Sequence, residues 1–455
     1  MVSHDIHNYL QPGRRAHLVG VGGVSMSPLA EVLHGAGMTI TGSDMQESRT
    51  VARLRSVGVH VVIGHLPENV QGADCVIRTA AVHDDNPEIA AARAAGIPVF
   101  ERAQAWGALM RQYPNALCVS GTHGKTTTTS MCTHIFMAAQ ADPTVMIGGV
   151  LPMLGVGHRV GQGDTIIMES CEYCNSFLSF FPTVAVILNV EADHLDFFKD
   201  LKDVQRSFRS FAQLVPENGW VVANAEDVHT METIANLDRS TITFGLEQGD
   251  VKANNLSWQN GMAQFDITVK GTHYAHVSLQ VPGIHNVKNA LAAAAAAYVL
   301  HIPTKAVEDG LASFIGAGRR FEHKGEFHGA QIYDDYAHHP SELEALLTTA
   351  KTLGYDRVIC AFQPHTYTRT KELFDEFVRV LQLADVTLLA EIYAAREKNT
   401  IGISSADLAA RIPGSRYFAT LPEVTAALTE LARPGDLILT VGAGDIYTAG
   451  EALLK

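Results

Sequence analysis

Short apolar runs alternate with longer helix-like stretches along most of the chain. Near the amino terminus the apolar runs are AHLVGVGGVSM, MTITGSD, VHVVIG and ADCVIR, and helix-like stretches such as SPLAEVLHGAG and NPEIAAARAAG separate them. Strands separated by helices of this length form parallel sheets with right-handed crossovers. The alternation therefore predicts an α/β fold, with a Rossmann-like layout in this part of the chain.

The same alternation continues through two further segments. Strand candidates follow at DTIIMES, TVAVILNV and GWVVANAED, and then at QIYDDYA, RVICAFQP, DVTLLAEIY and DLILTVGAGD. A chain of 455 residues suits two to four domains rather than one. We therefore predict three α/β domains, formed by residues 1–112, 113–316 and 317–455.

The charge of the chain limits the partners that it can have. The sequence contains 48 acidic and 34 basic residues, which gives a formal net charge of -14. Nucleic acids and anionic lipids select basic surfaces, so we expect neither a nucleic-acid partner nor a membrane partner. No run approaches the roughly 20 apolar residues of a membrane helix, and the start MVSHDIHNYLQPGRR lacks the apolar core of a signal peptide. We expect a cytoplasmic protein.

The six cysteines are scattered and do not indicate a disulfide framework. Cys171 and Cys174 form a C-x-x-C pair, for which a zinc site or a redox pair is the alternative interpretation. A structural zinc site needs four ligands, and the sequence has no second pair of this kind. The histidines with usable spacing lie in distant segments: His60 with His65, and His323 with His328.

The stretch CVSGTHGKTTTTS, residues 118–130, follows an apolar run and has the parts of a phosphate-binding loop. Such a loop needs glycines that allow close approach, a lysine for the β and γ phosphates and a hydroxyl for magnesium. Lys125 and Thr126 supply the last two, although Val119 stands where the usual pattern has its first glycine. The alternative is an ordinary loop between a strand and a helix.

Acidic and histidine side chains follow two other apolar runs of the middle segment. Glu172 comes after DTIIMES, and His194 comes after TVAVILNV. The carboxyl ends of parallel strands meet at one edge of a sheet, so both side chains are expected beside the phosphate loop. There they would hold a divalent metal together with the hydroxyl of Thr126. The alternative is a helix cap and a surface histidine.

A second glycine-rich turn, from Gly20 to Ser25, follows the first apolar run. Its glycines would let a diphosphate approach backbone N–H groups, and Asp44 after the next strand would meet a ribose hydroxyl. A nicotinamide-binding fold wants a small glycine or alanine where Ser25 stands, which disfavours a dehydrogenase. The alternative for Asp44 is that it caps the helix that begins near ESRTVARL.

Charged residues of the third segment gather at strand ends, in GRRFE, DDYAHHP and QPHTYTRT. An arginine at a domain junction suits a phosphate whose charge grows during transfer. His338 and Arg369 are candidates for recognising a small carboxylate. The alternative is that these charges are solvated and have no function.

Taken in order, these motifs resemble the Mur ligase family, ATP-dependent amide-forming enzymes of peptidoglycan synthesis. Within the family the similarity is to the branch that adds L-alanine. The ordered series covers essentially the whole chain: VGVGGVSMS, SGTHGKTTTTS, NVEADHLD, PGIHNVKNALAA, GAGRRFE, DDYAHHPSE, QPHTYTRT and VGAGD. The resemblance implies a Rossmann-like N-terminal domain for a UDP substrate, a central P-loop ATPase domain and a Rossmann-like C-terminal domain that brings the amino acid.

The resemblance also assigns roles to single residues. It implies that the UDP substrate meets Gly22, Gly23, Val24, Ser25, Met26, Asp44 and His123. It implies that ATP meets Gly121, Thr122, Gly124, Lys125, Thr126, Thr127, Asn286, Asn289, Arg320, Asp335 and Tyr336. The implied magnesium ligands are Thr126, Glu172 and His194, and the implied catalytic residues are Lys125, His194 and Arg320. The amino acid would meet His338 and Arg369.

The activity implied in this way joins L-alanine to UDP-N-acetylmuramate through an acyl phosphate, with ATP and Mg²⁺ as cofactors and a monomer or homodimer as the working form. Thr366 stands where many alanine-adding members have a basic residue. Members that act later carry a modified lysine, and no lysine occurs here between Lys202 and Lys252. The alternatives are a ligase that joins the same UDP-sugar to a preformed tripeptide, and a non-enzymatic nucleotide-binding protein.

Overall fold

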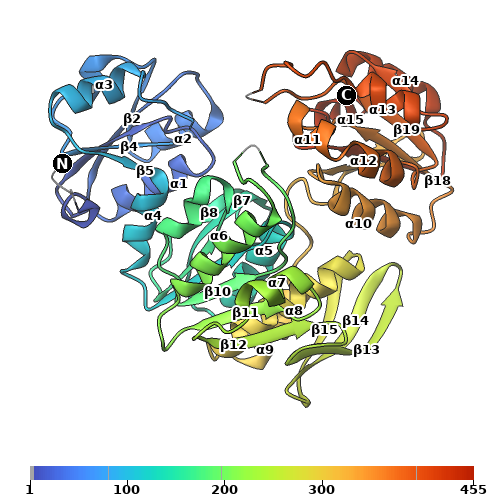
Figure 1. The fold of residues 1–455 in the computed structure, drawn as a ribbon, viewed down its shortest axis with the longest axis horizontal. Coiled ribbons are helices and arrows are strands. Elements are labelled where there is room, and N and C mark those ends of the chain that lie inside the picture. Colours follow the sequence, from blue (N-terminus) through green and yellow to red (C-terminus); the bar gives the residue numbers. More distant parts are fainter. Residues whose placement is uncertain (1–4, 80, 196, 396) are drawn as a thin grey trace. The chain divides into compact units, whose positions relative to one another are not determined.

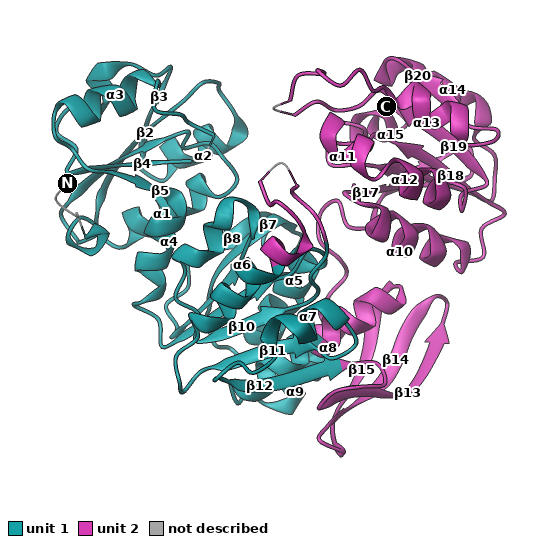
Figure 2. Ribbon diagram, in the orientation of Figure 1, with its two compact units in different colours: residues 1–191, 205–244, 292–310 teal, residues 192–204, 245–291, 311–455 magenta. Residues whose placement is uncertain are grey.

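The computed structural model describes residues 5–79, 81–195, 197–395 and 397–455. These residues form two compact units (Figure 2). The first unit consists of Met1–Glu191, Gln205–Phe244 and Ala292–Gly310, and the second consists of Ala192–Val204, Gly245–Leu291 and Leu311–Lys455. Among the described residues, no helix is long and apolar enough to cross a membrane.

The first unit begins with a five-stranded parallel sheet in the order β3-β2-β1-β4-β5 (Figure 1). Side-chain caps begin two of its helices: the side chain of Ser48 accepts a hydrogen bond from Val51 N, and that of Asn86 accepts one from Glu88 N. The strands are β1 (Arg15–Val19), β2 (Thr39–Asp44), β3 (His60–Ile63), β4 (Cys75–Arg78) and β5 (Val99–Glu101), and the α-helices are α1 (Met26–Gly35), α2 (Arg49–Ser56), α3 (Pro87–Ala94) and α4 (Arg102–Met110).

A second sheet of the same unit has the strand order β12-β11-β10-β6-β9-β7-β8. All neighbouring strands in it are parallel except β7 and β8. The strands are β6 (Asn115–Ser120), β7 (Thr144–Leu151), β8 (Val156–Arg159), β9 (Thr165–Glu169), β10 (Val184–Ile187), β11 (Trp220–Asn224) and β12 (Ser240–Gly245). Helices α5 (Lys125–Ala138) and α7 (Val228–Ile234) belong to this unit.

Three helices have residues in both units: α6 (Leu201–Gln213), α8 (Ile284–Val299) and α9 (Thr304–Ser313). In α8 the alanines of the run 292–297 are completely buried. A helix with so many small side chains approaches its neighbours closely and has a high intrinsic helix propensity.

The second unit contains an antiparallel set of strands, β13 (Val251–Gln259), β14 (Met262–Val269) and β15 (Thr272–Pro282). It also contains a six-stranded sheet in the order β16-β17-β21-β18-β19-β20, in which only β16 is antiparallel to its neighbour. These strands are β16 (Glu322–Phe327), β17 (Ala330–Asp335), β18 (Arg357–Phe362), β19 (Val386–Ala390), β20 (Arg416–Phe418) and β21 (Asp436–Val441).

Apolar layers cover both faces of this six-stranded sheet. Leu347 and Phe377 belong to one layer, and Val424 and Leu428 belong to the other. The helices that contribute to the two layers are α10 (Pro340–Lys351), α12 (Phe374–Leu381), α13 (Ser405–Arg411), α14 (Leu421–Leu431) and α15 (Tyr447–Leu453), and the short α11 (Tyr367–Glu372) follows β18. Burial on both faces is typical of parallel sheets and accounts for their continuous apolar runs.

The structure confirms the expected α/β fold, and each apolar run singled out in the sequence contains a strand. The three antiparallel strands β13, β14 and β15 were not among the expected elements. For β13 the physical reason is that most of its residues are exposed and polar and give no buried-strand signal. Buried and more exposed residues alternate in β14 and β15, so these two strands lack the continuous apolar runs on which the expectation relied.

Candidate functional site

The stretch 121–124 lies between the end of β6 and the first residue of α5. Gly121 and Gly124 have φ angles of 143° and 82°, in the region that favours glycine. A Cβ atom at Gly121 would lie 2.8 Å from Cβ of Leu188, so no larger residue fits there. Gly124 is the N-cap of α5 and provides no side-chain cap, so the first backbone N–H groups of the helix face the loop. This is the geometry of a phosphate-binding loop.

Lys125 folds back over this loop. Its Nζ atom donates hydrogen bonds to the carbonyl oxygens of Gly121 and Thr122, and it lies 3.1 Å from Oε2 of Glu172. Burial alone would lower the pKa of Lys125, but the neighbouring carboxylates of Glu172 and Glu169 raise it well above its ordinary value. The ammonium group therefore stays charged in the place where a phosphate group would bind.

Two carboxylates lie beside the phosphate loop, and the sequence had singled out only one of them as a site residue. The hydroxyl of Thr126 donates to Oε1 of Glu169 at 3.0 Å, and Oε2 of Glu169 accepts from Gly148 N. Glu172 pairs with Lys125 instead, and its side chain is 2% exposed. Hydroxyl and carboxylate oxygens are the ligands that Mg²⁺ prefers, so these residues fit such an ion. Cys171, between the two glutamates, is a free thiol.

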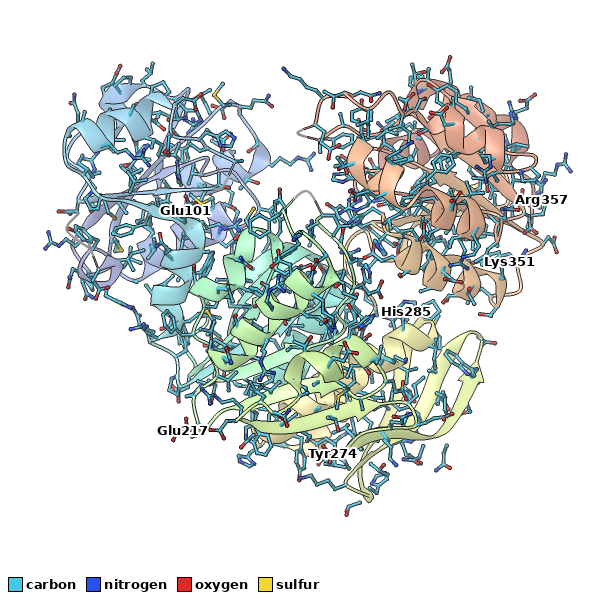
Figure 3. All side chains as sticks on the ribbon, viewed as in Figure 1. Glu101, Glu217, Tyr274, His285, Lys351 and Arg357 are labelled. Atoms are coloured by element: carbon cyan, nitrogen blue, oxygen red, sulfur yellow. The ribbon has the colours of Figure 1, made fainter. Side chains whose placement is uncertain are left out.

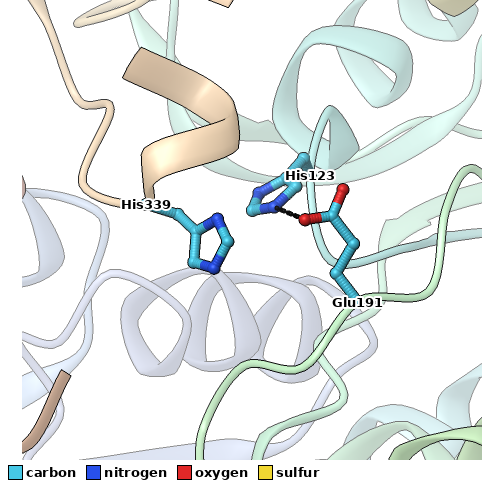
Figure 4. Close-up of side chains that lie close together, drawn as sticks. All are labelled: His123, Glu191 and His339. Atoms are coloured by element: carbon cyan, nitrogen blue, oxygen red, sulfur yellow. Dashed lines mark ion pairs between the residues drawn. The ribbon is translucent and has the colours of Figure 1, made fainter. Parts of the chain in front are cut away.

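His123 belongs to the phosphate loop itself. Its Nε2 lies 3.4 Å from Oε2 of Glu191, an ion pair that Figure 4 shows as a dashed line. Hydrogen bonds in both directions connect the loop to the segment after β10. His123 N donates to Oδ1 of Asn189, and Glu191 N donates to the hydroxyl of Thr122. The loop is thus fixed by the next strand of the sheet. His123 lies apart in sequence from the other residues expected to meet the UDP substrate, which follow β1 and β2.

The first glycine-rich turn connects β1 to α1. Asp44, at the end of β2, accepts a hydrogen bond from Gly22 N at 2.8 Å. A Cβ atom at Gly22 would lie 2.9 Å from Oδ2 of Asp44, so a larger residue there would displace this carboxylate. Ser48 caps α2, and the alternative of Asp44 as that cap is therefore wrong. Ser25 is the N-cap of α1 and makes no side-chain cap bond, so the start of α1 stays available for an anion.

In the second unit, Asn286 and Asn289 lie one turn apart at the start of α8, next to His285, which is labelled in Figure 3. Both asparagine side chains are buried. The amide of Asn286 donates to Pro282 O at 2.7 Å, and the amide of Asn289 donates to Oδ1 of Asn286 at 3.2 Å. This chain of bonds fixes the orientation of both amides before any ligand binds.

The two arginines at 319 and 320 have different surroundings. Arg319 donates to Oδ2 of Asp334 at 2.8 Å and to the carbonyl oxygens of Gly442 and Gly444, so its guanidinium group is held by the fold. The guanidinium of Arg320 lies 5.0 Å from the centre of the Tyr336 ring. The sequence assigned the phosphate role to Arg320. The contacts of Arg319 give Arg319 a structural role instead.

Asp335 lies at the end of β17, with its carboxylate turned into backbone N–H groups. Its oxygens accept hydrogen bonds from Phe321 N at 2.7 Å and from Ala337 N at 2.8 Å. Burial raises the pKa of Asp335 to about 6, although the charge of Arg320 lowers it. Asp335 therefore holds the segments before β16 and after β17 together, and Tyr336 follows it directly.

Arg369, on α11, is bonded to a residue that the sequence had not singled out. Its Nε and Nη2 atoms lie 3.2 and 2.9 Å from Oδ1 of Asp193, and both side chains are nearly buried. Burial would raise the pKa of Asp193, but the charge of Arg369 holds it well below its usual range. Asp193 directly precedes His194, so this ion pair connects the expected metal ligand to the expected amino-acid residue within one unit.

Two histidines lie beside this ion pair. Nδ1 of His365 lies 3.2 Å from Nη1 of Arg369, and Nδ1 of His338 lies 3.0 Å from Tyr336 O. Burial lowers the pKa of His365 to about 4 and that of His338 to about 3. Both rings are therefore neutral at physiological pH. Thr366, the N-cap of α11, has a φ of 66°, which is strained for a β-branched residue.

Two features define the class of this protein. The first is a phosphate loop with a charged lysine, and hydroxyl and carboxylate oxygens lie beside it. The second is a glycine turn with an acidic partner, and together they are typical of a multidomain α/β protein that binds nucleotides. Three family models cover the chain in order: "Mur ligase family, catalytic domain" at residues 15–114, "Mur ligase middle domain" at 119–297 and "Mur ligase, glutamate ligase domain" at 319–444. The chain belongs to the Mur ligase family.

Curated relatives match along nearly their whole length. A UDP-N-acetylmuramate--L-alanine ligase from Agathobacter rectalis is 46% identical, with 96% of this chain and 97% of the relative covered. One from Clostridium novyi is 43% identical, with 98% and 99% covered. Among solved structures, a UDP-N-acetylmuramate-alanine ligase from Thermotoga maritima is 30% identical, with 97% and 98% covered and a TM-score of 0.81.

Proposed function

We propose that this protein is an ATP-dependent ligase that joins L-alanine to the lactyl carboxylate of UDP-N-acetylmuramate in peptidoglycan precursor synthesis. The full-length similarity to ligases of this name carries the proposal. The arrangement around Lys125 supports it, because a charged lysine, a helix N-terminus and oxygen ligands beside one loop suit the γ-phosphate of ATP.

The proposed reaction has two steps. An oxygen of the lactyl carboxylate attacks the γ-phosphorus, the bond to the β-γ bridging oxygen breaks, and ADP leaves with that electron pair. The neutral amine of alanine then attacks the acyl carbon, and the tetrahedral intermediate collapses by expelling phosphate while the amine loses a proton. Phosphorylation is needed because a free carboxylate is a poor electrophile.

Two anions must approach each other in the first step, so cationic groups control its rate. Lys125 would hold the transferred phosphoryl group, and Arg320 is the second cation that the proposal assigns to it. Thr126, Glu172 and His194 would hold Mg²⁺, and Glu169 joins this set because it contacts the hydroxyl of Thr126. Bound Mg²⁺ would neutralise part of the phosphate charge.

The remaining roles follow the same division of the chain. Residues 1–112 would bind the UDP part, with Gly22 to Met26 at the diphosphate and Asp44 at the ribose. Residues 113–316 would bind ATP, with Asn286 and Asn289 at the adenine and Asp335 and Tyr336, from the third domain, at its ribose. Residues 317–455 would bring the amino acid to His338 and Arg369. We propose a cytoplasmic monomer or homodimer.

Release of ADP by the purified protein tests this proposal. The assay contains ATP, Mg²⁺ and UDP-N-acetylmuramate, with L-alanine, glycine, L-serine or the L-alanyl-γ-D-glutamyl-diaminopimelate tripeptide as acceptor. We expect release that requires the UDP-sugar and is fastest with L-alanine. Preference for the tripeptide would identify a recycling ligase instead, and ATP turnover that ignores the UDP-sugar would leave a nucleotide-binding protein.

A further inference from the structure

Helix α4 packs against α1 of the first domain (Figure 1) and against the 3-10 helix Tyr173–Ser179 of the central domain. All of these elements belong to the first compact unit. Residues 105–110 of α4 are buried, and Trp106, the bulkiest of them, is 1% exposed. A helix enclosed in this way cannot shift without moving its neighbours, because protein interiors are close-packed. Helix α4 therefore connects two domains that the proposed function uses for different substrates.

The indole of Trp106 is bonded to the first glycine-rich turn. Its Nε1–H group donates a hydrogen bond to the carbonyl oxygen of Ser25 at 3.2 Å. Ser25 is the N-cap of α1, and its own side chain makes no cap bond there. A buried indole N–H is costly without an acceptor, so this bond holds the two groups together. The side chain of Trp106 therefore fixes the backbone at the point where the turn becomes α1.

The same turn offers backbone N–H groups to a ligand. Among the described residues, the N–H groups of Val24 and Ser25 have no hydrogen-bond partner, whereas Gly22 N already donates to Asp44. Unpaired N–H groups at the start of a helix bind anions. These are the groups that the diphosphate of the proposed UDP-sugar would meet, and Trp106 holds the residue that carries one of them.

Gly107, the next residue of α4, lies directly against the central domain. A Cβ atom at Gly107 would overlap the carbonyl oxygen of Ser179, so the two backbones are in close contact and no larger residue fits between them. The contact continues one helical turn further on, where the guanidinium carbon of Arg111 lies 3.7 Å from the centre of the Phe181 ring. Helix α4 is thus attached to the central domain at two places.

The contact at Ser179 leads back to the phosphate loop. Ser179 is the last residue of the 3-10 helix Tyr173–Ser179, and Glu172 is the N-cap of that helix. The carboxylate of Glu172 pairs with Lys125 of the phosphate loop at 3.1 Å. A continuous series of contacts therefore runs from the first glycine-rich turn through α4 to the lysine of the second.

We propose that Trp106 is a positioning residue, which together with Gly107 places the first glycine-rich turn correctly relative to the phosphate loop. The lactyl carboxylate has to lie within about 3 to 3.5 Å of the phosphorus that it attacks, and a misplacement of about 1 Å costs up to about a hundredfold in rate. The carboxylate is connected to the diphosphate through the sugar, so the turn that holds the diphosphate determines where the carboxylate lies. This inference rests on the proposed ligase activity and adds a residue that acts on it through the turn.

Steady-state ADP release by the whole protein, with ATP, Mg²⁺, UDP-N-acetylmuramate and L-alanine, tests the role of Trp106. Trp106→Phe keeps an aromatic ring in the core and removes the N–H donor. We expect kcat to fall about tenfold, with the KM for ATP unchanged and the KM for the UDP-sugar changed by less than about threefold, because the unpaired N–H groups of the turn remain. Trp258→Phe is the matched control and should change none of these values, because Trp258 is 48% exposed on β13.

Gly107→Ala disturbs the other contact of α4 and should also lower kcat. Trp106→Phe combined with Gly107→Ala should be no slower than Gly107→Ala alone, because both changes break the same connection. An unchanged kcat in Trp106→Phe would overturn the positioning role, whether or not the KM for the UDP-sugar rises, since a bond that only shapes the binding turn would change the KM alone. Unmodified protein whose ADP release does not depend on the UDP-sugar would instead overturn the proposed function, and the positioning role with it.

Discussion

Replacement of Lys125 by methionine should separate two functions of this side chain. Methionine keeps the length of the apolar stem and removes the charge. In the structure the ammonium group of Lys125 lies 3.1 Å from Glu172, with side-chain exposures of 14% and 2%. We propose that the same ammonium holds the γ-phosphate of ATP. The substitution therefore removes the cation that the proposed mechanism uses, and it leaves the buried carboxylate of Glu172 without its ion-pair partner.

The two effects have different sizes. Loss of one preorganised cation at a transferring phosphoryl group costs about 4 kcal/mol of transition-state stabilisation, or about a thousandfold in rate. A buried carboxylate that loses its partner costs roughly 3 to 5 kcal/mol of stability. We take about 2 to 4 kcal/mol here, because Lys125 is partly exposed to water. The second change Glu172→Gln removes the uncompensated charge and should return most of the stability but none of the activity.

Thermal melting and ADP release on the same preparations measure the two effects. Lys125→Met should melt well below the unmodified protein, Lys125→Met with Glu172→Gln should melt close to it, and both should be inactive. Lys305→Met is the matched control and should change neither quantity, because Lys305 is 75% exposed and pairs with Glu308 and Asp309 of its own helix. Near-normal ADP release by Lys125→Met would refute the assignment of Lys125 to the transferred phosphate.

Three further outcomes are expected. Gly121→Ala should abolish ATP binding in a nucleotide titration, because its Cβ atom would lie 2.8 Å from Leu188 and φ is 143°; normal affinity would contradict the loop geometry. Asp193→Asn should raise the KM for L-alanine more than it lowers kcat, because it loosens Arg369; an unchanged KM would separate the pair from the amino acid. Glu31, bonded to His158 and Arg53, has its pKa lowered to about 2 despite burial, which alone would raise it. The ionised carboxylate of Glu31 therefore stabilises the folded state at pH values above its unfolded pKa near 4.5, and this stabilisation is lost as the pH falls toward 2. Glu31→Gln should make the melting temperature depend less on pH in this acid range.

The parts of the site that could be predicted from the sequence are those that one strand and its loop determine. Gly121, Gly124 and Lys125 follow a continuous apolar run, and the backbone angles that the glycines require are a property of the loop itself. Asp44 could likewise be placed at the edge of the first sheet. The sequence left open whether Asp44 meets a ribose or caps a helix, because Ser48 lies near the same helix end. In the structure Ser48 is the cap.

Contacts between distant segments could not be predicted in this way. Asp193 and Arg369 are 176 residues apart, and neither shows in its own surroundings that it binds the other. The different contacts of Glu169 and Glu172 could not be predicted from the sequence for another reason. A 3-10 helix (Tyr173–Ser179) with left-handed residues at Cys174 and Asn175 follows them, and it redirects the chain after β9. Only the folded turn decides which carboxylate meets Thr126 and which meets Lys125.

The two glycine turns of the chain differ in a way that matches their proposed substrates. The first turn, from Gly20 to Ser25, contains no cation, and Asp44 already occupies Gly22 N. A diphosphate that is only held in place needs backbone N–H groups and little more. The second turn adds Lys125 and oxygen ligands, which become useful only where charge develops during transfer. A lysine introduced at Ser25 should therefore tighten UDP binding without raising turnover, since binding that is equal in ground state and transition state does not accelerate the chemical step.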